Sequence, residues 1–183
     1  MLETLTFITG NPGKAEQLGR YLDFPVVHKK VDLVEIQSLD LGEVVRHKAQ
    51  EAYSVIQGPV IVEDTSLQFL ALGRLPGTFI KWFSEELGND GLCTLLDSYA
   101  DRSALAEVQF ALHDGKEVML FDGQVRGAIA EEPRGERGFG WDPIFIPDGS
   151  TKTYGEMADE EQKATSMRKI ALEKLEAYLK RAK

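Results

Sequence analysis

The sequence predicts an α/β protein with an elongated mixed β-sheet and helices on its faces. Short apolar runs at residues 5–8 and 26–34 each precede a helical pattern, which is the order of strand–helix units. A third run at 60–62 follows the second helical pattern, so it should pair in parallel with an earlier strand. Alternation over residues 104–125 is typical of an antiparallel hairpin. Parallel and antiparallel pairs are therefore expected in one sheet.

The composition limits the class of protein. With 183 residues, 43% of them hydrophobic, the chain can bury one substantial core, and we expect a single domain over residues 1–183. It has no low-complexity tract, internal repeat, basic-then-apolar leader or apolar stretch of about 18 residues. We therefore expect a soluble, cytoplasmic protein with no membrane partner. A net charge of -9 argues against a nucleic-acid partner, because capture of a phosphate backbone needs a basic surface.

The single cysteine, Cys93, excludes an internal disulfide. No cysteine or histidine cluster has the spacing of a zinc site. Cys93 lies among Leu92, Leu95 and Leu96, which favours a thiol in the core over a nucleophile.

Residues 9–14 are the first candidate site, since they join the apolar run at 5–8 to an amphipathic pattern over 18–22. In a strand–loop–helix unit, the free N–H groups of the helix start and a nearby ammonium suit a phosphate. The loop lacks the Walker A pattern, because Ile8 and Ala15 replace its first glycine and its metal-binding hydroxyl. A capped helix without a ligand fits equally well. The loop consists of Thr9, Gly10, Asn11, Pro12, Gly13 and Lys14.

The second strand, residues 26–34, is expected to continue to Gln37 before Ser38 and Asp40 cap a helix. Apolar residues then recur with helical spacing over 41–56. Lys48 falls on this apolar stripe. It can extend to solvent along the stripe or reach into a pocket, and the pattern leaves both interpretations open.

The run at 60–62 has no polar gaps, which indicates a strand covered on both faces. Glu63 and Asp64 follow directly, and we expect the strand to leave the core over residues 63–66. Ligands of open α/β sheets bind where strands end, so this carboxylate pair is a second candidate site. A solvated acidic turn is the alternative.

Two helical patterns follow at residues 79–87 and 91–99, and Lys81 in the first suits a solvated face or a pocket. The hairpin strands are expected at 104–112 and 117–125, joined at Asp114 and Gly115. Residues 160–179 predict a final helix. Near its start lie Lys163, Ser166 and Arg168, which in isolation would be a solvated face.

Residues 131–156 form a long segment rich in glycine and proline, and a loop of this length is usually functional. Phe139 and Trp141 are two positions apart, so in an extended segment both rings project to one side and suit stacking on a planar base. Packing of the rings against the end of the sheet is the alternative.

Together these spaced motifs, from Phe7 to about Leu172, resemble those of the Ham1-type nucleoside triphosphate pyrophosphatases, the family that includes inosine triphosphatase. The motifs that carry the resemblance are Thr9-Gly10-Asn11 with Lys14, Glu35, Lys48, Glu63-Asp64-Thr65-Ser66-Leu67, Leu75-Pro76-Gly77, Pro133-Arg134-Gly135, Gly138-Phe139-Gly140-Trp141-Asp142-Pro143, Lys152-Thr153 with Glu156-Met157, and Lys163 with Ser166 and Arg168.

The resemblance implies hydrolysis of a non-canonical purine triphosphate, such as ITP, dITP or XTP, to the monophosphate and pyrophosphate with Mg2+ as cofactor. It also implies a substrate cleft and a homodimer. Glu35 and Asp64 match the metal-binding carboxylates, and Asp64 also matches the residue that activates the attacking water. Glu63 would support Asp64. Lys14 and Lys48 would stabilise the charge of the leaving pyrophosphate.

The resemblance assigns the remaining substrate contacts residue by residue. Phe139 would stack on the purine, and Lys163, Ser166 and Arg168 would donate hydrogen bonds to its edge. Where the family normally has histidine, this chain has Met167, which removes one hydrogen-bonding side chain at the base. The other implied substrate contacts are Thr9, Gly10, Asn11, Pro12, Gly13, Lys14, Lys48, Thr65, Lys81, Gly140, Trp141 and Asp142.

Two other functions remain compatible with the sequence. The first is a related pyrophosphatase that prefers pyrimidine or modified triphosphates. The second is a nucleotide-binding protein without turnover, against which the intact Glu35, Asp64 and Lys14 argue.

Overall fold

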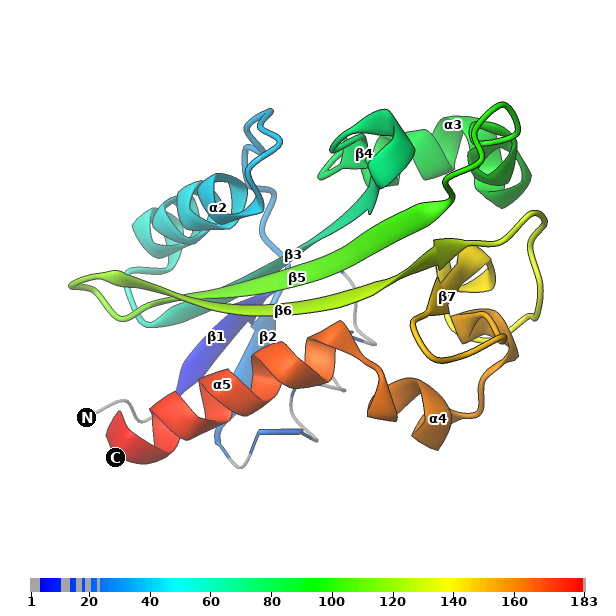
Figure 1. Ribbon diagram of the computed structural model, residues 1–183. Helices are drawn as coiled ribbons and strands as arrows, with labels where there is room; N and C mark the ends of the chain where they lie inside the picture. Colours follow the sequence, from blue (N-terminus) through cyan, green and yellow to red (C-terminus); the bar gives the residue numbers. More distant parts are fainter. Residues whose placement is uncertain (1–3, 11–13, 16–17, 19–20, 23, 183) are drawn as a thin grey trace. The chain divides into compact units, whose positions relative to one another are not determined.

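The computed structural model describes residues 4–10, 14–15, 18, 21–22 and 24–182 (Figure 1). In chain order the elements are β1 (Leu5–Ile8), β2 (Val26–Lys29), α2 (Leu41–Ile56), β3 (Val60–Phe69), η1 (Leu70–Leu72), β4 (Pro76–Gly77), α3 (Ile80–Thr94), β5 (Ser103–His113), β6 (Val118–Ile129), η2 (Asp142–Ile144), β7 (Phe145–Pro147), η3 (Tyr154–Glu156), α4 (Asp159–Ala164) and α5 (Met167–Ala182).

The strands form one seven-stranded sheet in the order β2-β1-β3-β5-β6-β7, with β4 paired to β3. β1 pairs in parallel with both β2 and β3, as the two strand–helix units predict. β4 is antiparallel to β3, and β7 is antiparallel to β6. The predicted mixed sheet is therefore confirmed.

The chain divides into two compact units. The first combines residues 1–64, 108–123 and 168–183, and the second combines residues 65–107 and 124–167. β3, β5 and β6 contribute residues to both units. The expected single domain over residues 1–183 stays a prediction.

In the first unit, α2 begins where the Asp40 side chain accepts a hydrogen bond from the Glu43 N–H, so one of the two predicted caps is confirmed. The buried stripe of α2 packs against Ile8, Val60 and Val62 of the sheet. α5 lies on the other face of this part of the sheet (Figure 1). There the ring of Tyr178 lies 5.5 Å from that of Phe121 on β6. The sheet is thus covered on both faces, as the continuous apolar run at 60–62 predicts.

Two strands differ in length from the prediction. β2 ends at Lys29, and residues 30–40 have no helix or strand. β3 does not leave the core after Val62 but continues to Phe69. The prediction that the strand ends at residues 63–66 is wrong. Because cations accompany both carboxylates, their charge does not force the strand out of the sheet.

The second unit contains the long segment at residues 131–156. It is not one open loop, because η2, β7 and η3 all lie within it. The Thr153 hydroxyl donates a hydrogen bond to the Arg134 carbonyl oxygen at 2.7 Å, which fastens the two ends of the segment together. The predicted helix at 160–179 is divided into α4 and α5 by Thr165 and Ser166.

The remaining elements agree with the prediction in kind. The two helical patterns at 79–99 form α3, which is kinked at Gly88, where φ is 64°. β5 and β6 form the predicted hairpin, and the Asp114 N–H donates to the Glu117 carbonyl at its turn.

Cys93 is buried, as predicted for a thiol in the core, and burial raises the pKa of this thiol to about 11. None of the helices described is both long and apolar enough to span a membrane.

Candidate active site

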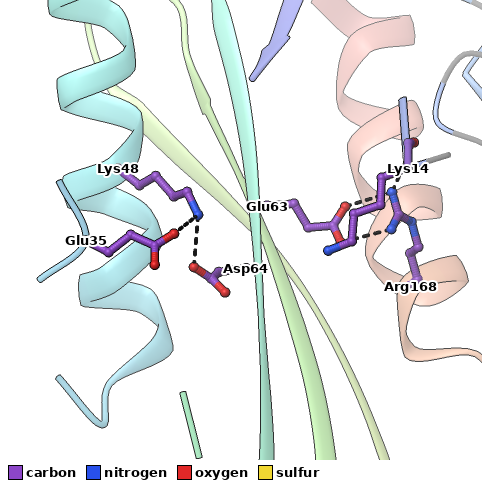
Figure 2. A network of polar contacts seen from close by, with 6 residues as sticks. All are labelled: Lys14, Glu35, Lys48, Glu63, Asp64 and Arg168. Atoms are coloured by element: carbon purple, nitrogen blue, oxygen red, sulfur yellow. Dashed lines mark hydrogen bonds and ion pairs between the residues drawn. The ribbon is translucent and has the colours of Figure 1, made fainter. Parts of the chain in front are cut away.

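Glu63 and Asp64 are consecutive residues of β3, and their carboxylates point to opposite sides of the strand (Figure 2). Successive side chains of a strand alternate between the two faces of the sheet. Asp64 therefore shares the face of Val60 and Val62, which packs on α2. Glu63 faces the other side, where Lys14 and Arg168 lie. The sequence would predict that the two carboxylates lie on opposite faces, but only once β3 is known to continue through residue 64.

On the α2 side, the Lys48 ammonium lies between two carboxylates (Figure 2). Its Nζ is 2.7 Å from Oε1 of Glu35 and 3.2 Å from Oδ2 of Asp64. Burial acts to lower the pKa of Lys48, but the charges of Asp64 and Glu35 outweigh it and leave the pKa raised. Lys48 thus stays charged, and its side chain, 16% exposed, ends between two carboxylates rather than in open solvent. We call Glu35, Lys48 and Asp64 the α2-side cluster.

The α2-side cluster has a donor set that suits Mg2+. Glu35 and Asp64 supply carboxylate oxygens, which this hard cation prefers. Across the part of the chain that the structure describes, no three His, Cys, Asp or Glu side chains gather as a complete metal cage. Mg2+ is commonly held by one or two carboxylates together with water and substrate phosphates, so a pair of carboxylates is sufficient. Glu35 and Asp64 therefore fit the predicted metal site.

On the opposite side of β3, the Glu63 carboxylate is buried between two cations. Its Oε1 lies 3.0 Å from Nζ of Lys14 and accepts a hydrogen bond from Nη1 of Arg168 at 2.9 Å. Its Oε2 makes an ion-pair contact of 2.7 Å with Nη2 of Arg168. We call Lys14, Glu63 and Arg168 the α5-side cluster. Glu63 was expected to support Asp64, and the structure instead directs it to these two cations.

The predicted phosphate loop is described only in part. Lys14 and Ala15 are helical, whereas Asn11, Pro12 and Gly13 lie outside the described residues. The backbone N–H of Thr9 donates to the Lys29 carbonyl at 3.2 Å. His28 Nε2 lies 2.7 Å from the carbonyl oxygen of Thr9, to which it donates. β2 thereby holds the start of the loop, a role for His28 that sequence reasoning did not identify.

The two predicted aromatic contacts of the base, Phe139 and Trp141, lie in the second unit. Phe139 has an exposed ring, with 59% of the residue accessible. Trp141 packs instead against Phe145 and Tyr154, with ring centroids 5.6 Å and 6.5 Å away. The segment is not extended, because Gly138 and Gly140 have φ angles of 77° and 62°. The prediction that an extended segment directs both rings to one side is therefore wrong: Phe139 is accessible, and Trp141 belongs to an aromatic cluster.

Asp142 is buried and holds the turn that carries Phe139. Its Oδ2 accepts the Phe139 backbone N–H at 2.8 Å and lies 3.4 Å from Nε2 of Gln162. Burial raises the pKa of Asp142 to about 6, although both hydrogen bonds act to lower it. A Cβ atom at Gly138 would lie 2.0 Å from the same oxygen, so only glycine allows the turn to close over the carboxylate. Asp142 thus shapes the predicted base contact.

Gln162 is a site residue that the sequence did not reveal. A glutamine near a helix start has no sequence pattern that separates it from a surface residue.

The predicted base contact Lys163 forms an ion pair of 2.8 Å with Glu160 on the same helix, and the Lys163 side chain is 60% exposed. Ser166 lies between α4 and α5, where its N–H donates to the Lys163 carbonyl. Met167 begins α5 with a buried side chain, 8% exposed.

Three further predicted contacts are described in the second unit. Thr65 lies within β3 directly after Asp64. Lys81 is the second residue of α3, and its Nζ lies 5.0 Å from the centre of the exposed Trp82 ring. The carbonyl of Gly140 accepts a hydrogen bond from the Asn89 side chain at 2.9 Å, which ties the Phe139 turn to α3. The structure therefore gathers the catalytic candidates Lys14, Lys48 and Asp64 into two clusters in the first unit, and one of these clusters also holds the base candidate Arg168. The other base candidates, Phe139, Lys163 and Ser166, belong to the second unit.

The sequence profile of the Ham1 family matches residues 5–178. This chain belongs to the Ham1 family. It is 46% identical over 178 residues to inosine triphosphate pyrophosphatase 2 of Trypanosoma cruzi, an alignment that covers 95% of this chain and 91% of that protein. The family resemblance that the motifs predict is thereby confirmed.

Solved structures of Ham1 proteins have the same fold. The Ham1 protein of Staphylococcus aureus superposes with a TM-score of 0.88 at 27% identity, covering 98% of this chain and all (100%) of that one. A nucleoside-triphosphatase, or dITP/XTP pyrophosphatase, of Mycobacterium abscessus superposes with a TM-score of 0.79 at 27% identity, covering 94% and 98% of the two chains. The mixed sheet with flanking helices is thus the Ham1 fold.

Proposed function

We propose that this Ham1 family member hydrolyses non-canonical purine nucleoside triphosphates, such as ITP, dITP and XTP, to the monophosphate and pyrophosphate. The observation that carries the proposal is the convergence of Glu35 and Asp64 on Lys48, which places two carboxylates suited to a metal ion beside a cation suited to phosphate. The similarity to an inosine triphosphate pyrophosphatase supports the choice of substrate.

Mg2+ is the proposed cofactor, held by the Glu35 and Asp64 carboxylates. When bound, it would supply positive charge that offsets the negative charge of the triphosphate. Lys48 lies beside both carboxylates and stays protonated, so it is suited to contact phosphate oxygens next to the metal. The residues of the α2-side cluster thus divide between metal binding and phosphate binding.

Asp64 is the proposed general base. Its side chain is 25% exposed, which leaves the carboxylate accessible to a water molecule. It would take the proton of the water that attacks the phosphorus atom of the α-phosphate, and the bond between the α- and β-phosphates would break. Lys14 and Lys48, with the backbone of the Thr9–Lys14 loop, would stabilise the charge that develops on the departing pyrophosphate.

Base selection is assigned to a stacking residue and several donors. Phe139 has an exposed ring suited to stack on a purine. Arg168, Ser166 and Lys163 are the proposed donors to the base edge. Hypoxanthine and xanthine present an acceptor oxygen at C6, whereas adenine presents an amino donor there. Adenine would leave these donors unpaired in the complex, which is a costly mismatch.

We further propose that the protein is a cytoplasmic homodimer. α3 carries the exposed apolar side chains Trp82 and Leu87, 57% and 42% accessible, which is a suitable contact surface for a second copy. Sedimentation at working concentration tests the assembly, and a monomer would exclude it.

A triphosphate panel tests the function. Pyrophosphate release is measured from ITP, dITP, XTP, GTP, ATP and pyrimidine triphosphates, each with and without Mg2+. The proposal expects Mg2+-dependent release from ITP, dITP and XTP at much higher kcat/KM than from ATP. Comparable rates on ATP would overturn the selectivity, and preference for a pyrimidine triphosphate would indicate a related pyrophosphatase. Binding of ITP without release of pyrophosphate would indicate a nucleotide-binding protein instead.

A further inference from the structure

Glu63 is the most enclosed charged group of the two clusters. Its side chain is 2% exposed, whereas those of its partners Lys14 and Arg168 are 20% and 15% exposed. A carboxylate this deeply buried is costly unless cations and donors compensate it, and here two cations do so. The partners come from distant parts of the sequence, because Lys14 ends the Thr9–Lys14 loop and Arg168 is the second residue of α5.

Several contacts fix the orientation of the Arg168 guanidinium. Its two terminal nitrogens face the two oxygens of Glu63 at 2.9 Å and 2.7 Å. Nη2 also lies 3.4 Å from the backbone carbonyl of Lys14, to which it donates. The guanidinium carbon lies 5.5 Å from the centre of the Phe110 ring, within the range of a cation–π contact. Arg168 is therefore held by a carboxylate, a carbonyl and a ring.

One carboxylate thus serves two residues with different proposed roles. Lys14 belongs to the phosphate loop, and Arg168 is a proposed donor to the base. Both are cations that approach the same Glu63 oxygen, Oε1, at 3.0 Å and 2.9 Å. Without the carboxylate charge, two positive groups this close would repel each other and lose their shared anchor.

We propose that Glu63 is a positioning residue that couples phosphate binding to base recognition by holding Lys14 and Arg168 on one carboxylate. It does not touch substrate. This inference rests on the proposed function, because the roles of Lys14 in phosphate binding and of Arg168 in base recognition are themselves proposed there. A purely structural role, in which the buried ion pair only fastens α5 to β3, makes a different prediction: substitutions would change stability but affect all ligands equally.

The first test is a double-mutant cycle with Glu63→Gln and Arg168→Lys, measured on ITP and ATP with Mg2+. Glu63→Gln keeps the shape of the side chain and removes its charge. Arg168→Lys keeps the positive charge and removes the guanidinium group that contacts both Glu63 oxygens. We expect Glu63→Gln to raise KM for ITP about tenfold with a smaller change in kcat. Lys14 and Arg168 would no longer be held in position, and the enzyme would therefore bind ITP less tightly. The ratio of ITP to ATP kcat/KM should fall, and the double variant should resemble the single ones.

The second test uses inorganic pyrophosphate as a competitive inhibitor, because it has no base. Arg168→Lys should weaken its inhibition about threefold, since Glu63 loses the partner that orients it and no longer holds Lys14 in place. This test keeps the inference falsifiable where Glu63→Gln fails to fold. Glu63→Asp, which retains the charge on a shorter side chain, should recover part of the selectivity.

Asp122→Asn is the matched control, because Asp122 forms an exposed 3.0 Å ion pair with Lys174 on the same helix as Arg168. It should leave KM, selectivity and pyrophosphate inhibition unchanged. If the wild-type protein releases no pyrophosphate from ITP, the proposed function is wrong. If the wild type is active but Arg168→Lys keeps normal pyrophosphate inhibition, or the two substitutions act independently on KM, the coupling by Glu63 is wrong.

Discussion

The backbone N–H of Phe139 donates a hydrogen bond to the buried carboxylate of Asp142 over 2.8 Å. This bond connects an exposed aromatic ring, suited to a base, with a titratable group whose pKa is raised to about 6 by burial. The conformation of the Phe139 turn is therefore linked to the protonation of Asp142.

The first prediction concerns stability against pH. The pKa of Asp142 rises from 3.8 when unfolded to about 6 when folded, so the folded state binds more protons in this interval. Its contribution to the free energy of unfolding is therefore greatest at low pH and is lost as pH rises from about 4 to about 6. The whole effect is on the order of 3 kcal/mol.

Asp142→Asn should remove this dependence, since asparagine accepts the Phe139 N–H without titrating. Urea unfolding at several pH values should show the wild type losing stability relative to this variant between about pH 4 and 6. Gln162→Leu should move the same loss to higher pH, because it deletes a hydrogen bond that lowers the pKa of Asp142. A constant difference between wild type and Asp142→Asn across this interval would contradict the assignment.

The second prediction concerns Asp64. Asp64→Asn should lower kcat for ITP by roughly 10²- to 10⁴-fold, the usual contribution of a general base. It should also lower the pKa of Lys48, because a charge that raises this pKa is removed. Pyrophosphate release measures the first effect, and NMR titration of the lysine measures the second. A folded Asp64→Asn variant with normal kcat would exclude the base role.

The third prediction concerns metal binding without turnover. Mg2+ should raise the melting temperature of the wild type in the presence of pyrophosphate, because a ligand that binds only the folded state stabilises it. Glu35→Gln should reduce this increase, and EDTA should abolish it. Asp122→Asn should respond as the wild type does. An undiminished Mg2+ effect in Glu35→Gln would remove Glu35 from the metal site.

The fourth prediction concerns the pairing of β6 with β7. A Cβ atom at Gly127 would lie 2.2 Å from the Ile146 carbonyl oxygen and 2.8 Å from the Phe145 ring. Gly127→Ala should therefore cost about 1–3 kcal/mol or more of stability in urea unfolding. Gly58→Ala is the control, because a Cβ there has no atom within 4 Å, and its effect should stay within about 0.5 kcal/mol. Equal effects of the two substitutions would contradict the predicted clash.

Local patterns predicted much of the fold. The apolar run of β1, the capped amphipathic helix α2 and the hairpin of β5 and β6 follow from periodicity and turn residues. Periodicity and turn residues did not predict the length of β3, because two consecutive carboxylates, Glu63 and Asp64, are typical of the end of a strand. Inside a sheet such residues are stable only when distant cations compensate them, and a local pattern does not show those cations.

The sequence by itself determined the family, the mixed sheet and the set of charged residues that carry the proposed chemistry. Tertiary structure decided which charge meets which. Strand alternation places Glu63 and Asp64 on opposite faces, but only the packing of the helices sets Lys48 beside Asp64 and Arg168 beside Glu63. It also separated Trp141 from Phe139, since packing against Phe145 and Tyr154 is a long-range contact. Such contacts depend on the whole core, so residue spacing does not determine them.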